Sequence, residues 1–218
     1  MRRAISHAAG GDDPPPGCRT VAAVTPSVCL PYEFPDPVRT DRLLLRAMTD
    51  HDVDDIYAYQ SLPDVCRYLT FEPRSRDEVA EKVAEYSAAL VLNGEGDFWQ
   101  LAIEAAENPG RVIGDVYFAI KDATNATCEI GWTLHPDHTG SGYMTEAAGA
   151  VLSLAFNGLK LHRAIALLDP RNHASVALCD RLGMRKEAHF SEDLWFKGAW
   201  GDTLSYAILN REWAARAL

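Results

Sequence analysis

The feature that most constrains this chain is a pair of glycines placed directly before a helix-forming run. Residues 134–156 read LHPDHTGSGYMTEAAGAVLSLAF, so Gly140 and Gly142 flank a single serine and good helix formers follow. Glycine adopts positive φ at little cost and lets a backbone approach a ligand closely. The first turn of a helix carries unpaired N–H groups and a partial positive charge. The sequence therefore predicts that a phosphate or another anion binds at this turn.

Two glycine motifs for nucleotides do not fit this turn. A dinucleotide fingerprint places a third glycine three residues after the second, and Thr145 occupies that position. The fingerprint also needs an acid about twenty residues later, where the chain reads LHRAI. A P-loop needs Gly-Lys followed by Ser or Thr, and the chain contains no such triplet. A nucleotide-dependent redox enzyme is therefore disfavoured.

Apolar periodicity and turn residues predict an α/β chain. Apolar residues within 75–92 recur at three-to-four spacing, which indicates a helix. The predicted strands are 39–48, 98–105, 111–120, 128–134 and 163–169, the other helices are 49–62, 142–157 and 172–184, and a closing β-hairpin turns at KGAWGD, 197–202. The order β-α-α-β-β-β-α-β-α-β-β predicts one covered sheet.

The beginning of the chain differs in composition from the rest. Seven of the twelve prolines fall at or before Pro37, and GGDDPPPG is a low-complexity cluster of turn-forming residues. Residues 1–36 are therefore predicted to be a Pro-rich, flexible extension or an extended wrapping segment. The single folded domain is predicted to cover 37–218.

Composition narrows the partners and the compartment. The formal net charge of −10 at pH 7 argues against a nucleic-acid partner, since a phosphate backbone needs a basic surface. No apolar run approaches the roughly 20 residues of a membrane helix, and no apolar signal core is present, so we expect a cytoplasmic protein without a membrane partner. Five cysteines without a C-x-x-C pair fit reduced thiols. His135 and His138 have no further ligands beside them, so we expect no metal.

Four segments together carry a resemblance to a known family. They are RTDRLLLRAMT (39–49), EIGWTLHPDHTGSGYMTEA (129–147), DPRNHASVALCDRLGM (169–184) and FKGAWGDTLSYAIL (196–209). In this order and spacing they resemble the GNAT N-acetyltransferases, in the branch related to ribosomal-protein N-terminal acetyltransferases (RimJ/RimL-like), over about residues 38–215. The resemblance implies an α/β (α+β) fold, the GNAT acyl-CoA N-acyltransferase fold, with a mixed central sheet of about seven strands flanked by helices. A splayed strand pair would form the acetyl-CoA cleft.

The resemblance implies acetyl-CoA as co-substrate, held by the glycine turn and the strand before it. A Gln or Arg, a fixed Gly and a final Gly or Ala mark the family's pyrophosphate turn, and here Thr139, Gly142 and Met144 occupy these positions. Because no Lys or Arg lies within 134–146, backbone N–H groups would hold the phosphates. The implied cofactor-binding residues are Trp132, Thr133, Leu134, Thr139, Gly140, Ser141, Gly142, Tyr143, Met144, Thr145, Asn172 and Ser175.

Two parts of this set have more specific roles in the family. Trp132 to Leu134 would pair with the pantetheine arm of the cofactor as an added strand. Asn172 would steady the same arm, and it also matches a helix N-cap, two roles that are compatible.

The implied reaction is direct transfer of an acetyl group to a primary amine. Glu129 is the candidate base, with Glu192 and Asp193 as weaker rivals. The backbone N–H of Leu134 is the candidate donor to the oxyanion. The family often places a tyrosine as the acid that protonates the thiolate, but Cys179 occupies that position, so Ser175, one turn earlier, is the substitute.

Two matters stay open at this point. The acceptor is either a protein N-terminus or a small-molecule amine, because the loops that select it have no readable motif. The alternative function is a non-catalytic GNAT-fold module that binds acyl-CoA or a partner. Many members of the family form homodimers, and the resemblance implies the same here.

Overall fold

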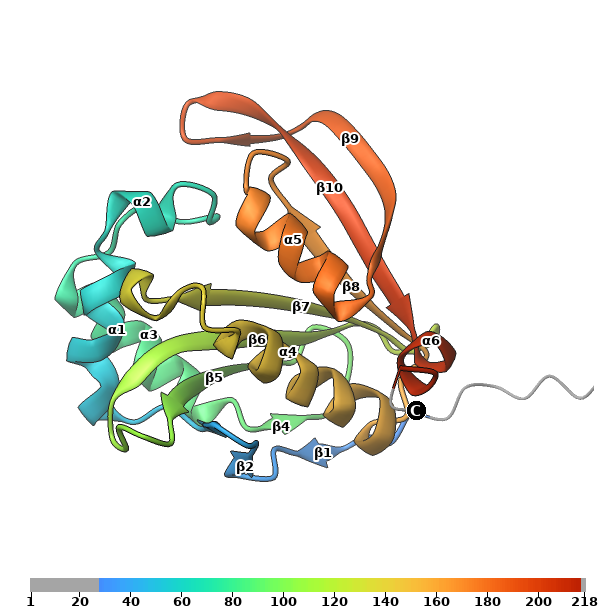
Figure 1. The fold of residues 1–218 in the computed structure, drawn as a ribbon, viewed down its shortest axis with the longest axis horizontal. Helices are drawn as coiled ribbons and strands as arrows, with labels where there is room; N and C mark the ends of the chain where they lie inside the picture. The colour runs from blue at the N-terminus through green and yellow to red at the C-terminus, as the bar shows by residue number, and fades with distance from the viewer. Residues whose placement is uncertain (1–27, 217–218) are drawn as a thin grey trace, which may run out of the picture.

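A mixed eight-stranded sheet runs through the computed structural model, which describes residues 28–216 (Figure 1). All neighbouring strands are antiparallel except β7 and β8, which are parallel. In spatial order the strands are β2 (Val38–Arg39), β3 (Leu43–Arg46), β5 (Phe98–Ala105), β6 (Val112–Asp122), β7 (Thr127–Leu134), β8 (Arg163–Leu168), β10 (Ala199–Leu209) and β9 (Arg185–Phe196). A separate two-stranded sheet pairs β1 (Tyr32–Glu33) with β4 (Val91–Leu92).

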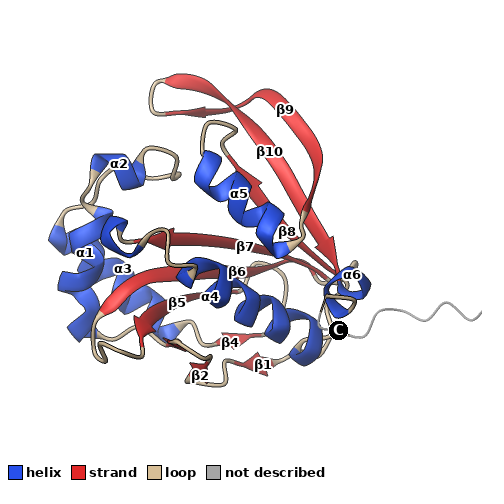
Figure 2. Ribbon diagram, viewed as in Figure 1, coloured by secondary structure: helices blue, strands red, loops and turns tan. Residues whose placement is uncertain are grey.

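Helices cover both faces of the main sheet, as Figure 2 shows. They are α1 (Val53–Gln60), α2 (Pro63–Cys66), α3 (Arg76–Ala88), α4 (Tyr143–Ser153), α5 (His173–Leu182) and α6 (Asn210–Ala214), with 3₁₀ turns at Asp50–Asp52 and Pro136–His138 and a π-helical turn at Leu154–Gly158. Within residues 28–216, no helix has both the length and the apolar character needed to cross a membrane.

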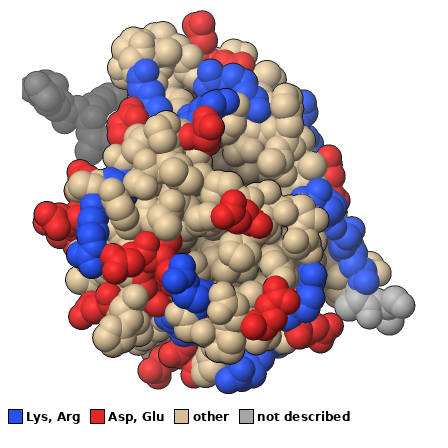
Figure 3. All heavy atoms as spheres, turned by 60° about the vertical axis from the view of Figure 1, so that its left-hand side comes forward, with Lys and Arg blue, Asp and Glu red and all other residues tan. Residues whose placement is uncertain are grey.

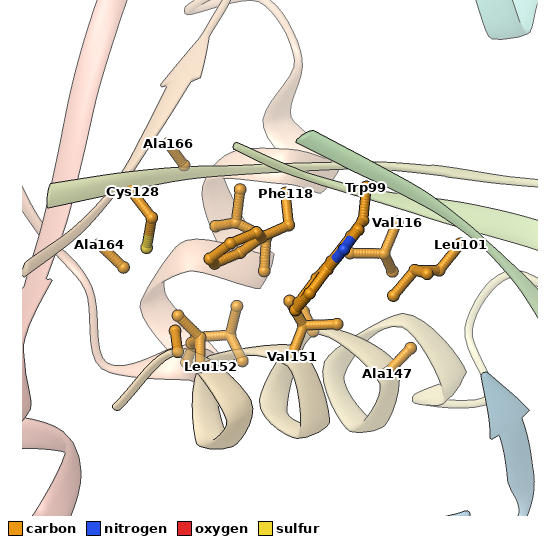
Figure 4. Close-up of a cluster of buried hydrophobic side chains, with 14 of the residues drawn as sticks. Trp99, Leu101, Val116, Phe118, Cys128, Ala147, Val151, Leu152, Ala164 and Ala166 are labelled. Carbon is orange, nitrogen blue, oxygen red and sulfur yellow. The ribbon is translucent and has the colours of Figure 1, made fainter. Parts of the chain in front are cut away.

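The larger core lies between the sheet and α4. Trp99 of β5 and Phe118 of β6 stack with ring centroids 5.2 Å apart. Both face Ala147 and Val151 of α4 (Figure 4). Because side chains alternate along a strand, the opposite face of β5 and β6 is left for a second apolar cluster, formed with α1 and α3.

Most predicted elements are confirmed, and the differences have local causes. Strand 98–105 matches β5, and the closing hairpin is present. The predicted helix 75–92 ends at Ala88, because Val91 and Leu92 pair with β1 instead. The predicted hairpin turn 197–202 is shorter, since Lys197 and Gly198 alone have positive φ and the strand resumes at Ala199.

Residues 1–36 are predicted to be a flexible extension or an extended wrapping segment, and the end of this segment packs against the domain. Phe34 is buried in the main core, and β1 pairs with β4. The ring of Tyr32 lies 5.9 Å from that of Trp99. Residues 28–36 are therefore part of the folded unit, while residues 1–27 lie outside the described residues.

The parallel pair β7 and β8 separates after three residue pairs. The register runs from Thr127 opposite Arg163 to Glu129 opposite Ile165 and then stops, although both strands continue. Beyond that point β8 follows β10, with which it pairs along its whole length. The predicted splayed strand pair is therefore confirmed (Figure 1).

Candidate active site

A cleft of about 500 Å³ lies where β7 leaves β8. Its walls come from helices α1 and α3, from strands β5 to β8, from the N-terminal end of α5 and from the segment between α2 and α3. Of the residues predicted from the sequence, the cleft brings together Glu129, Trp132, Thr133, Asn172 and Ser175. Residues that are 46 positions apart in the chain thus share one cavity.

The backbone of β7 directs two N–H groups into the gap. The His135 N–H donates to the Ile113 carbonyl at 2.8 Å. In an antiparallel ladder bonded and non-bonded pairs alternate, so Leu134 and Trp132 fall in non-bonded positions opposite β6. Their N–H groups point away from β6, toward the side that β8 has left. An extended ligand lying in this gap can accept hydrogen bonds from both.

The N-terminal end of α5 is tied to β7 across the gap. Asn172 Oδ1 accepts a hydrogen bond from the Ser175 N–H at 3.1 Å, which confirms the predicted N-cap. The Trp132 indole N–H donates to the Ser175 hydroxyl oxygen, also at 3.1 Å. The Ser175 hydroxyl keeps its own proton for a further partner. Cys179, one turn later, is fully buried in the core, and this burial raises its thiol pKa to about 12.

The glycine turn has the conformation that the sequence predicts. Gly140 and Gly142 both have φ of +79°, and α4 begins at Tyr143. Thr139 differs from expectation, because its N–H and its hydroxyl both donate to the Pro136 carbonyl. The N–H groups left for an anion therefore belong to residues 140–145.

Met144 departs from the family pattern without crowding this turn. Its side chain is 7% exposed and packs in the main core with Ala147 and Val151. The Met144 side chain, at a position where the family has Gly or Ala, therefore lies inside the domain and away from the N–H groups of the turn.

Two arginines reach the turn from other parts of the chain, which the sequence did not indicate. Arg42, just before β3, donates to the Ser141 carbonyl at 2.9 Å and pairs with Glu146 at 2.7 Å. Arg181 of α5 donates to the Thr145 hydroxyl at 3.2 Å. The only hint was that Arg42, Glu146 and Arg181 lie in three of the four family-like segments.

Glu129 lies at the fork of the strands. It is the last β7 residue paired with β8, and its carboxylate lies 3.1 Å from the Lys121 ammonium. Glu192 and Asp193, the rival bases, lie on the exposed strand β9 and do not line the cleft. The charge of Glu129 is thus balanced by Lys121.

Asp115 is a cleft residue that the sequence analysis missed. It is 2% exposed, and its carboxylate accepts hydrogen bonds from Tyr59 and Gln100, both at 2.5 Å. Burial raises the pKa of Asp115 to about 6, against the opposing effect of these hydrogen bonds. The available signal was one acid inside the apolar strand VIGDVYFAI, 112–120.

His135 and His138, the two histidines of the predicted turn, do not belong to a metal-ligating group within the described residues. The ring nitrogen Nδ1 of His135 accepts the Asp137 N–H at 3.2 Å and so closes its own turn. No group of three metal-ligating side chains occurs within residues 28–216. On the face shown in Figure 3, acidic and basic side chains are interspersed.

Both the sequence and the fold of this chain are similar to those of known proteins. A sequence profile described as "Acetyltransferase (GNAT) domain" matches residues 42–185. An uncharacterized N-acetyltransferase of Bacillus subtilis (strain 168), YnaD, is 32% identical over 176 residues, which are 81% of this chain and 98% of that protein. The crystal structure of a GNAT-family acetyltransferase from Bacillus anthracis has a TM-score of 0.72 and 28% identity, covering 81% of this chain and 99% of that one.

A more distant structure shares the fold. The spermidine N-acetyltransferase from Vibrio cholerae, solved in complex with CoA and spermine, has a TM-score of 0.68 and 22% identity. The match covers 80% of this chain and 99% of that one.

We expect the Gly114→Ala variant to displace the β7 backbone. Gly114 lies opposite Leu134, and an added Cβ would lie 2.5 Å from the Thr133 carbonyl oxygen and 3.1 Å from the Leu134 Cα. Because these are backbone atoms, β7 must shift, and binding of acetyl-CoA should weaken by about tenfold or more in calorimetry. Gly131→Ala is the matched control, since its Cβ would meet only the Tyr117 side chain at 3.6 Å. Equal affinities in the two variants would contradict this role of β7.

A second prediction concerns the pH dependence of stability. Folding raises the pKa of the Asp115 carboxyl, so this group binds more protons in the folded state than in the unfolded state. Its stabilising contribution to the free energy of unfolding is therefore complete below pH 3.8 and is lost as the pH rises through about 6. We expect urea unfolding to show that, between pH 4 and 7, the free energy of unfolding of the wild type falls by on the order of 3 kcal/mol relative to that of Asp115→Asn. This value follows from about 1.4 kcal/mol for each unit by which the pKa is raised. A difference that does not change with pH would contradict the prediction.

Proposed function

The chain belongs to the GNAT acetyltransferase family and is an acyltransferase, and on that premise we propose that it moves an acetyl group from acetyl-CoA directly to a primary amine. The acceptor is a protein N-terminus or a small-molecule amine. The observation that carries the proposal is the gap beside β7, into which the N–H groups of Trp132 and Leu134 point. An amide-containing arm such as pantetheine can pair with these groups as an added strand.

In this proposal the glycine turn binds the pyrophosphate of coenzyme A. The unpaired N–H groups of residues 140–145 stand at the positive end of the α4 dipole. Arg181 adds cationic charge beside the same turn, while the charge of Arg42 is balanced by Glu146. Asn172 lies on the wall of the cleft, where it would steady the pantetheine arm.

The catalytic roles follow from which atoms can reach the gap. Glu129 removes a proton from the ammonium, and the amine nitrogen then attacks the thioester carbonyl carbon. The Leu134 N–H donates to the oxyanion that forms. When the carbon–sulfur bond breaks, the Ser175 hydroxyl gives its proton to the departing thiolate and takes up the surplus proton of the attacking nitrogen, which leaves a neutral amide, a neutral thiol and the serine hydroxyl. The Trp132 indole N–H supports this role, because it stabilises the negative charge that develops on the serine oxygen during the transfer.

The composition of the cleft favours an amine acceptor. Its wall carries four acids, two basic residues and six aromatic residues; the acids are Glu85, Asp115, Glu129 and Asp169. Three of the aromatic rings form a row, with Phe98 5.9 Å from Tyr86 and 6.0 Å from Tyr117. Carboxylates attract a cation and aromatic rings pack on its carbon chain. The related fold that binds spermine makes polyamines a reasonable group to test among the small amines.

The compartment follows from the donor. Acetyl-CoA is a product of intracellular metabolism, so the proposed activity belongs in the cytoplasm.

The first test is thermal unfolding with acetyl-CoA. At ligand near a hundred times Kd, binding adds about 2.7 kcal/mol of stability, which corresponds to a rise of about 5 to 10 °C in Tm for a domain of this size. NADPH serves as the control and should cause no comparable shift. Release of CoA is then followed with peptides bearing a free N-terminus and with polyamines. An acetyl-CoA shift without turnover on any amine would favour the non-catalytic acyl-CoA-binding module.

The catalytic assignments are tested by two substitutions. Glu129→Gln and Ser175→Ala should each lower kcat by about 100-fold, the usual contribution of one acid or base, while the acetyl-CoA shift in Tm persists. Glu192→Gln is the matched control for an acid outside the cleft and should keep the wild-type kcat. Full kcat in the Ser175→Ala protein would remove Ser175 as the acid, and full kcat in Glu129→Gln would remove Glu129 as the base.

A further inference from the structure

Asp115 is a buried carboxylate without a cationic partner. Its three hydrogen-bond partners are all neutral: Tyr59 and Gln60 from α1 and Gln100 from β5. Three acids are buried in the part of the chain that the structure describes, and the other two, Asp52 and Glu104, both pair with Arg46. Buried charges in proteins are normally paired, so the solitary charge of Asp115 calls for an explanation.

The position of Asp115 supplies that explanation. Asp115 lies on β6 directly opposite Thr133 and lines the cleft. Thr133 in turn lies between Trp132 and Leu134, whose N–H groups face the gap. Facing residues of a bonded antiparallel pair are roughly 5.5 Å apart at Cα. Glu129, by contrast, lies three residues before Trp132, roughly 10 Å along the strand, and already has Lys121 as its counter-ion. Asp115 is therefore the nearer acid to the proposed thioester site.

We propose that Asp115 binds the ammonium group of the acceptor and so places its nitrogen beside the thioester, which the nitrogen attacks after Glu129 has taken one proton from it. The inference rests on the proposed function and identifies the part of the acceptor that this site selects, a primary ammonium group with N–H bonds to donate. Tyr59 binds one carboxylate oxygen and Gln100 the other, so the orientation of the carboxylate is fixed. A carboxylate accepts about four hydrogen bonds, which leaves capacity for the ammonium.

The charged groups around Asp115 agree with this role. Arg74 on this wall donates to the Gln60 amide oxygen at 2.7 Å and packs 3.8 Å above the Phe71 ring, so its charge opposes the rise in the pKa of Asp115 from a distance but forms no ion pair with that carboxylate. Burial and the charge of Asp115 raise the pKa of the Tyr59 hydroxyl, and Asp52, the N-cap of α1, and Asp55 in its first turn add to this effect, so the hydroxyl stays a donor. With a pKa of about 6, Asp115 is ionised at pH 7 and ready to receive a cation.

The test is steady-state kinetics on Asp115→Asn with an acceptor found for the wild type. We expect the KM for the amine to rise at least tenfold, the KM for acetyl-CoA to stay within twofold and Tm at pH 8 to be equal or higher. In the wild type, kcat/KM for the amine should fall as the pH drops through about 6, because the carboxylate becomes protonated. An amine KM within twofold of wild type would overturn the proposal.

A second variant keeps the proposal testable if Asp115→Asn fails to fold. Tyr59→Phe removes one hydrogen bond to the ionised carboxylate, so the pKa of Asp115 should rise. The acid limb of the kcat/KM profile should then move to higher pH, which a merely structural effect would not cause. An unchanged midpoint would overturn the assignment.

A binding experiment separates failure of this inference from failure of the proposed function. If the wild type acetylates no amine, 1,4-diaminobutane and the neutral 1,4-butanediol are compared by thermal shift at equal ionic strength. A shift by the diamine alone, lost in Asp115→Asn but kept in Glu129→Gln, would support an ammonium site without turnover. No diamine shift in the wild type, or the same shift in Asp115→Asn, would overturn it.

Discussion

The end of the β7–β8 ladder at Glu129 and Ile165 is the constraint on which the rest of the site depends. Had the parallel pairing continued, the N–H groups of Trp132 and Leu134 would be satisfied within the sheet and no ligand could use them. β8 is held away by its ladder to β10, and α5 enters the gap with its N-terminal end. The hydrogen bond from Trp132 to Ser175 then fixes the width of the opening. The cleft is thus a gap between β7 and β8 that the surrounding elements keep open.

A second tie explains why distant segments of the chain belong together. The Glu146 carboxylate accepts hydrogen bonds from the Thr40 hydroxyl at 2.6 Å, from the Arg42 N–H at 2.8 Å and from the Arg42 guanidinium at 2.7 Å. These groups lie more than one hundred positions apart, and they join the beginning of β3 to the first turn of α4. The glycine turn is therefore fixed from the sheet side as well as by its own helix. Its N–H groups are oriented before any anion arrives, which lowers the entropic cost of binding.

Local signals in the sequence predicted local structure, and long-range packing limited the rest. The positive φ of Gly140 and Gly142, the Asn172 cap and strand 98–105 all depend on neighbouring residues, and all are confirmed. The pairing of β1 with β4 joins two-residue strands across the chain, so it has no periodicity to detect. The arginines at the turn were missed for a similar reason, since only the folded sheet brings Arg42 there. Conformations set within one segment could be predicted, while contacts between segments, such as that of Arg42 with the glycine turn, could not.

Asp115 shows how burial converts an unremarkable residue into a functional one. In the sequence it is a single acid in an apolar strand, and only α1, through Tyr59 and Gln60, closes over it. Keeping an ionised carboxylate in such a place costs stability, and evolution commonly tolerates that cost where the charge has a task. The same domain neutralises its other buried acids with one arginine, so pairing was available as a solution. A carboxylate left unpaired beside the diverging strands is best explained by a cation that arrives with the substrate.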